Sequence, residues 1–255
     1  MIYDIQKASL LKRFSAGLLD FFLIIILAVG VMWLMSWITG MGKYSDTLQK
    51  YYKQYGKEYG VDFSISEKDF DKLTEEEQAH YDHVYKLIFE EHDDAVKAYN
   101  MTRSLPLLII TVSVLIPVAV FEFLIPLLLK NGRTVGKKVF NLGVVFKNSV
   151  KMSNFALFVR SILGKYTIEL MVPTMLVMMV FYYNVMGIIG LVVLGLLLIM
   201  QIVILIATKT NACIHDVLAN TAVVDMSSQM VFDSVDELVA YKEELHQQEV
   251  KQKEY

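Results

Sequence analysis

The chain has 255 residues, of which 55% are apolar, and a formal net charge of −3. Ordinary soluble domains are about 45–50% apolar, so this composition is typical of a membrane protein and argues against a soluble one. The single cysteine, Cys213, excludes an internal disulfide. We expect no nucleic-acid partner.

The apolar residues are concentrated in three runs, residues 18–38, 105–129 and 166–207. A helix of about 20 apolar residues crosses a bilayer, and lipid-embedded backbone must be helical to satisfy its polar groups. The last run is long enough for two crossings if it reverses near Asn184. We therefore predict an all-α fold, a polytopic transmembrane helix bundle of about four spans, with three as the alternative count.

Charge sets the orientation of these spans. Residues 130–165 contain eight Lys and Arg and no acid, and Lys7, Lys12 and Arg13 precede the first run. Basic residues in short segments favour the cytosolic side, so we place both termini there. The first run exceeds the about 7–15 apolar residues of a signal peptide, so we expect it to be an uncleaved anchor.

This topology divides the chain into seven parts. They are the amino terminus and first span (1–39), an extracytoplasmic helical insertion (40–102), the second span (103–129), a basic cytosolic loop with an interfacial helix (130–165), the third and fourth spans (166–207), a cytosolic segment (208–226) and an acidic cytosolic tail (227–255).

The insertion has two stripes of aromatic residues at helical spacing, the first including Tyr51 and Tyr55 and the second Tyr81 and Tyr85. Thr74, followed three residues later by a glutamate, predicts the start of the second helix. Either the stripes pack on each other as a small helical cap, or they form an exposed docking face for a protein partner. The nearby histidines form no convincing metal set, and we expect neither a metal nor a cofactor.

Ionisable residues inside the apolar runs are the strongest functional signal, because each costs about 2.5–3.5 kcal/mol at the centre of a span. Arg13 and Asp20 share one helix face, with two small residues between them, and Glu122 and Glu169 lie in later spans. Two interpretations stay open. The charges are ties between helices, or they form an ion or proton site.

The basic loop predicts contact with anionic lipid headgroups on the cytosolic side. Arg133, Lys137 and Lys138 follow a glycine-containing turn, and residues 153–165, with Arg160, have the pattern of an interfacial helix. His215 has no nucleophile with a supporting pattern beside it, so we predict that the protein is not an enzyme.

Three separated motifs resemble the RDD family of bacterial membrane proteins, named for one arginine and two aspartates. They are RFSAGLLD at 13–20, NGRTVGKK at 131–138 with NLGVV at 141–145, and HDVLANT at 215–221. The resemblance implies that Arg13, Asp20 and Asp216 are the named residues, and that the protein is a multi-pass protein of the bacterial cell membrane. We expect Asp216 to pair with Arg13 or with a lysine of the loop.

The family resemblance leaves two functions open. Transport, including sodium–proton exchange, has been proposed for some members, and a homo-oligomer would let four spans build a complete route. Alternatively, the protein is a non-transporting subunit or scaffold that recruits partners through its insertion and its tail. The sequence departs from the family pattern at Asn211, where a basic residue is common, and in the length of its first outer loop.

Overall fold

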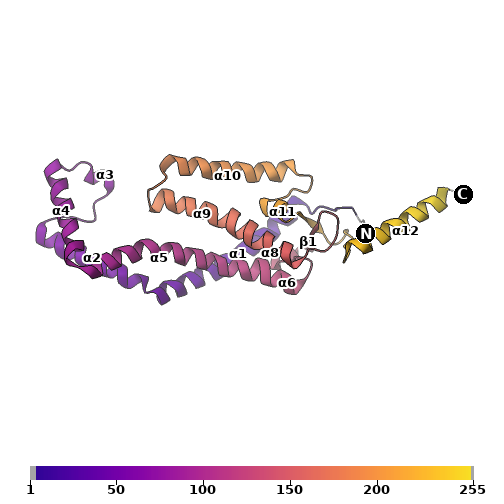
Figure 1. Ribbon diagram of the computed structural model, residues 1–255, viewed down its shortest axis with the longest axis horizontal. Coiled ribbons are helices and arrows are strands. Elements are labelled where there is room, and N and C mark those ends of the chain that lie inside the picture. The colour runs from indigo at the N-terminus through magenta and orange to yellow at the C-terminus, as the bar shows by residue number, and fades with distance from the viewer. Residues whose placement is uncertain (1–3, 254–255) are drawn as a thin grey trace. The chain divides into compact units, whose positions relative to one another are not determined.

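A computed structural model describes residues 4–253 (Figure 1). It has four helices that are long and apolar enough to cross a membrane, Leu10–Thr39, Asp93–Leu129, Asn154–Tyr182 and Gly187–Ala207. The predicted four-span helical fold is therefore confirmed. The chain folds as two compact units, residues 29–113 and the remaining described residues, and each is described by itself.

The insertion unit, residues 29–113, contains the end of α1 (Leu10–Thr39), three helices between the first two spans and the start of α5 (Asp93–Val118). The three helices are α2 (Met41–Tyr59), α3 (Glu67–Phe70) and α4 (Glu75–Glu91). Gly40 and Gly60, at φ 65° and 70°, allow the chain to leave helical geometry on either side of α2. Thr74 and Glu77 form the predicted capping box at the start of α4.

The two aromatic stripes pack on each other, which is the first of the two interpretations. Tyr51, Tyr55, Val84 and Ile88 form the buried core between α2 and α4. Tyr51 and Tyr55 are only 9% and 4% exposed, so the docking prediction is wrong for these two residues. When two amphipathic helices follow each other in the chain, each can bury its apolar face against the other.

The other unit, which we call the membrane unit, contains most of the spans. Its elements are α1 (Leu10–Thr39, up to Ala28), the end of α5, η1 (Ala119–Leu124), α6 (Ile125–Leu129), α7 (Val135–Val139), α8 (Asn154–Phe158), η2 (Val159–Met171), α9 (Val172–Val177), η3 (Met178–Tyr182), α10 (Gly187–Ala207), α11 (Ile214–Leu218) and α12 (Val235–Lys253), with two strands. The segments η1, η2 and η3 are π-helical, a wider winding that often occurs at functional sites.

The predicted boundary at residue 165 does not separate two helices in the described part of the chain, because the residues expected to form an interfacial helix belong to the third span. Ser153 caps α8, which continues without interruption through η2, α9 and η3 as the third span. No proline or turn breaks the helix between the charged and the apolar part, so the two form one element. The reversal near Asn184 is confirmed, since α9 and α10 lie side by side in Figure 1 and Asn184 has φ 52°.

A short antiparallel sheet was not predicted. Strand β1 (Leu142–Phe146) pairs with β2 (Thr221–Asp225), and Val144 lies opposite Val223. Asn141 and Asn220 precede the strands with φ of 55° and 53°, a left-handed conformation that asparagine tolerates well. The sheet joins the segment before the third span to the segment after the fourth, and so it positions α7 and α11 beside the ends of the spans.

Candidate functional site

Asp216 is fully buried at the start of α11 and accepts hydrogen bonds from two arginines. Arg160 donates from Nε (3.1 Å) and Nη2 (2.8 Å) to Oδ1, and Arg13 donates from Nη2 to Oδ2 at 3.0 Å. Burial would raise the pKa of Asp216, but the Arg160 guanidinium, with His215 and Arg13, holds that pKa well below its usual range. Asp216 is therefore ionised, and the expected pairing with Arg13 is confirmed.

Asp20, on α1, is held by neutral donors. The Thr134 hydroxyl donates to Oδ2 at 2.5 Å, and the Gly136 backbone N–H donates to Oδ1 at 2.7 Å. Gly136 is required here, because a Cβ atom at that position would overlap the Ala16 carbonyl and lie 3.0 Å from Cγ of Asp20. Within the described chain, no basic side chain forms an ion pair with Asp20.

Glu122 is a buried carboxylate of η1, 1% exposed. Lys165 donates to its Oε1, while its Oε2 has no hydrogen-bond partner among the described residues and lies 3.9 Å from Nζ of Lys137. Lys137 also donates to the Thr134 hydroxyl oxygen at 3.3 Å. Lys137 and Thr134 thus connect Glu122 with Asp20.

Lys137 has an altered proton affinity. Burial lowers its pKa to about 8, although Glu122 and Asp20 partly offset this effect. A lysine with such a pKa exchanges its proton near physiological pH, unlike an ordinary surface lysine.

Glu169 is joined to the same region through His215. The Nδ1 atom of His215 lies 2.8 Å from Oε2 of Glu169, and the His215 backbone N–H donates to Oε1 at 3.0 Å. The other ring nitrogen lies 3.6 Å from Oδ1 of Asp216. A Cβ atom on Gly164 would lie 2.7 Å from that of His215, so glycine allows η2 and α11 to approach closely.

A cavity of about 420 Å³ lies against this polar cluster. Its lining combines charged side chains with apolar ones from α1, β1, β2 and the end of α10. The lining residues are Leu10, Arg13, Phe14, Ala16, Gly17, Asp20, Lys137, Leu142, Arg160, Lys165, Leu205, Cys213, His215 and Val223.

The structure thus places the five predicted polar residues in two groups beside one cavity. Arg13 pairs directly with Asp216, which His215 joins to Glu169, while Thr134 and Lys137 join Asp20 to Glu122. Thr134, Lys165 and His215 were not predicted as part of the site. Lys137 and Arg160 do not form part of an exposed basic surface, because both are buried and pair with acids of other segments, and their predicted contact with lipid headgroups is untested. Lys138 is exposed and Arg133 is half-buried, and lipid contact at these two positions stays a prediction.

Cys213, His215 and Asp216 have potential metal-binding atoms within 4.8 Å of one another. Their chemistry does not favour a metal ion. Asp216 is already neutralised by two arginines, and burial raises the pKa of the Cys213 thiol, which disfavours the thiolate that metals bind.

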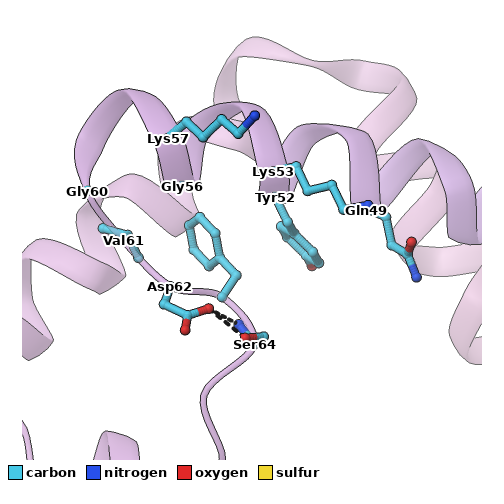
Figure 2. Close-up of a pocket in the computed structure, with 10 residues that line it drawn as sticks. Gln49, Tyr52, Lys53, Gly56, Lys57, Gly60, Val61, Asp62 and Ser64 are labelled. Atoms are coloured by element: carbon cyan, nitrogen blue, oxygen red, sulfur yellow. Dashed lines mark hydrogen bonds between the residues drawn. The ribbon is translucent and has the colours of Figure 1, made fainter.

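The insertion unit has its own groove of about 770 Å³ between α2 and the loop that follows it (Figure 2). Tyr52 and Lys53 lie on the helix side, and Asp62 and Ser64 lie on the loop, where Asp62 accepts two hydrogen bonds from Ser64. Tyr81 and Tyr85 are half-buried against Phe63, so their predicted role in docking is untested.

Comparison with known proteins gives one match. The family model described as the RDD family matches residues 7–220, a range that includes all five residues of the predicted polar cluster. No curated protein and no solved structure matches the chain.

Proposed function

The chain belongs to the RDD family of membrane proteins, and on that premise we propose that it exchanges a small cation for a proton across the membrane. The observation that carries this proposal is the position of Lys137. Its ammonium group lies 3.9 Å from Glu122, shares the Thr134 hydroxyl with Asp20, and has a pKa of about 8.

Charge balance supports an exchange of proton and cation. The cluster described above has four acids, Asp20, Glu122, Glu169 and Asp216, and four bases, Arg13, Lys137, Arg160 and Lys165. When Lys137 releases its proton, a region with few solvent contacts gains one uncompensated negative charge. A cation restores the balance, so proton and cation are alternative occupants.

The available ligands suit a small hard cation such as sodium. Such ions prefer oxygen atoms, and the carboxylate oxygens of Asp20 and Glu122 and the Thr134 hydroxyl would provide them. The protonated ammonium of Lys137 would exclude the cation by repulsion. Ionisable groups buried in spans frequently belong to ion pathways, and Glu122 lies in a π-helical segment.

Proton flux in liposomes that contain only the purified protein tests this proposal. A sodium gradient is imposed, and the internal pH is followed with a dye. We expect sodium-dependent proton movement that rises as the external pH passes about 8, the pKa of Lys137. Glu122→Gln and Asp20→Asn, in folded protein, should reduce the flux to that of empty liposomes.

The chain offers a matched control for the lysine. Lys137→Met should abolish exchange, whereas Lys138→Met, which removes an exposed neighbour with the same charge, should leave it intact. Absence of flux for every alkali cation tested would contradict transport.

The second candidate function is a non-transporting subunit that recruits a protein through its cytosolic tail. Leu238 of α12 packs against Val150 and Phe232, which anchors the start of the helix, while Val239 and Val250 are exposed. An anchored helix with exposed apolar side chains offers a surface to which a partner can bind. Loss of partner capture on Val239→Asp, with unchanged folding, would support it.

A further inference from the structure

The charged side chains that line the cavity beside the polar cluster are mostly basic. Three of the four acids of the cluster, Glu122, Glu169 and Asp216, are absent from its lining, whereas Arg13, Lys137, Arg160 and Lys165 all contribute to it. The acid that does line it, Asp20, has its oxygens engaged by Thr134 and Gly136. An occupant of the cavity would therefore meet mainly positive side chains.

Several basic groups of the lining keep unused hydrogen-bond donors. Arg160 uses Nε and Nη2 on Asp216, and its Nη1 has no partner within the described part of the chain. Lys165 and Lys137 each make a single side-chain hydrogen bond, although an ammonium group has three donors. Guanidinium and ammonium groups with free donors are the side chains that bind phosphate oxygens.

The rest of the lining is apolar and reaches the surface of the protein. Leu10 and Phe14 of α1 are 52% and 69% exposed, and Leu205 lies at the end of the fourth span. The volume of about 420 Å³ is within the range of small-molecule sites. The lining thus has a basic part and an apolar part. A ligand with an anionic head and a hydrocarbon chain matches both.

We propose that the cavity binds the phosphate of an anionic amphiphile, a lipid headgroup whose hydrocarbon chain lies along Leu10 and Phe14. This site goes beyond the proposed exchange and does not depend on it. The two are coupled, however, because both involve Lys137. A bound phosphate stabilises the ammonium form of Lys137 and would oppose uptake of a cation.

Thermal unfolding of the detergent-solubilised protein tests the site without any ion gradient. The probes are a short-chain phosphatidic acid, a phosphatidylcholine with the same chains, and inorganic phosphate. We expect phosphatidic acid to raise the unfolding midpoint in a saturable way and phosphatidylcholine to leave it unchanged, because the choline group adds a cation to the headgroup.

A steric variant separates this cavity from other lipid contacts. Gly17 lines the cavity, and a Cβ atom there meets nothing within 4 Å, so Gly17→Leu fills the cavity without removing a charge. Gly30→Leu is the matched control, since its Cβ is also unobstructed and it lies on the same helix away from the cavity. Gly17→Leu should weaken binding of phosphatidic acid at least about tenfold, and Gly30→Leu should not.

Each outcome decides the proposal. If inorganic phosphate protects as well as phosphatidic acid and Gly17→Leu abolishes both effects, the site binds phosphate and the natural source is a free anion. Equal protection by phosphatidylcholine would overturn the proposal, because the apolar wall alone would then explain binding. Equal binding by the two glycine variants would overturn it as well, since the lipid would lie elsewhere.

Discussion

Arg13 and Asp216 are 203 positions apart in the chain, and Nη2 of Arg13 donates to Oδ2 of Asp216 at 3.0 Å. Arg13 also donates from Nη1 to the backbone carbonyls of Thr210 and Asn211, just after the fourth span. Because Arg160 of the third span occupies the other oxygen of Asp216, one carboxylate ties together the first span, the third span and the segment after the fourth.

Replacing Asp216 should destabilise the protein strongly. Asp216→Asn removes the negative charge and leaves Arg13 and Arg160 buried without a counter-charge. Breaking a buried ion pair from one side costs about 3–5 kcal/mol. Thermal unfolding in detergent measures the effect.

Asp233→Asn is the control for this change. Asp233 pairs with Lys151, but its side chain is 73% exposed. Exposed ion pairs contribute about 0–1 kcal/mol, so this variant should unfold almost as the wild type does. Equal destabilisation by the two variants would show that the burial of Asp216 has no energetic consequence.

The spans and the insertion helices could be predicted from sequence, because each depends on local information. A run of about 20 apolar residues requires a helix in lipid. The capping box at Thr74 fixes the start of α4 within the sequence itself. The sheet could not be predicted in the same way. Each strand has only five residues, and Leu142 finds its partner at Asp225, far along the chain.

The site was predicted only in part, for a similar reason. Sequence shows that charges gather near one end of the spans, but not which base neutralises which acid. Lys137 and Arg160 were therefore assigned to lipid headgroups, whereas they face Glu122 and Asp216 inside the protein. Thr134 gave no signal of its own, because a single threonine in a loop most often caps a helix, as this one also does for α7.

Gly136→Ala should disrupt the contact between α1 and α7. The added Cβ would overlap the carbonyl oxygen of Ala16, which is backbone and cannot move aside cheaply. Overpacking of this kind costs about 1–3 kcal/mol. Gly30→Ala, whose Cβ is unobstructed, serves as the control in the same unfolding measurement and should change stability little. A wild-type midpoint for Gly136→Ala would contradict the close approach of α7 to α1.

The altered pKa of Lys137 predicts how stability depends on pH. Its folded-state pKa of about 8 lies below the ordinary 10.5. Between these values the unfolded chain binds more protons than the folded protein, so the free energy of unfolding rises with pH across this window. Each pKa unit corresponds to about 1.4 kcal/mol, which sets an upper bound of about 3 kcal/mol.

Unfolding of wild type and Lys137→Met at a series of pH values isolates this contribution. The difference in stability between the two proteins should change between pH 8 and 10.5, with the wild type gaining relative to the variant. Lys138→Met provides the reference for an exposed lysine. Parallel curves for wild type and Lys137→Met would show that Lys137 titrates normally, and would also remove the main support for proton exchange at this residue.

Tyr55 tests the packing of the insertion unit. Tyr55 is 4% exposed, and its hydroxyl donates to Glu91 and lies 2.9 Å from Nε2 of His92. The hydrogen bond to Glu91 is the main reason that its pKa is raised to about 12. Tyr55→Phe keeps the ring and removes only these polar contacts, which should cost about 1–3 kcal/mol.

Tyr59→Phe changes an exposed tyrosine one turn further along α2 and should be nearly neutral. If the two variants unfold alike, Tyr55 is not held between α2 and α4. Its burial would then no longer argue against a role in docking.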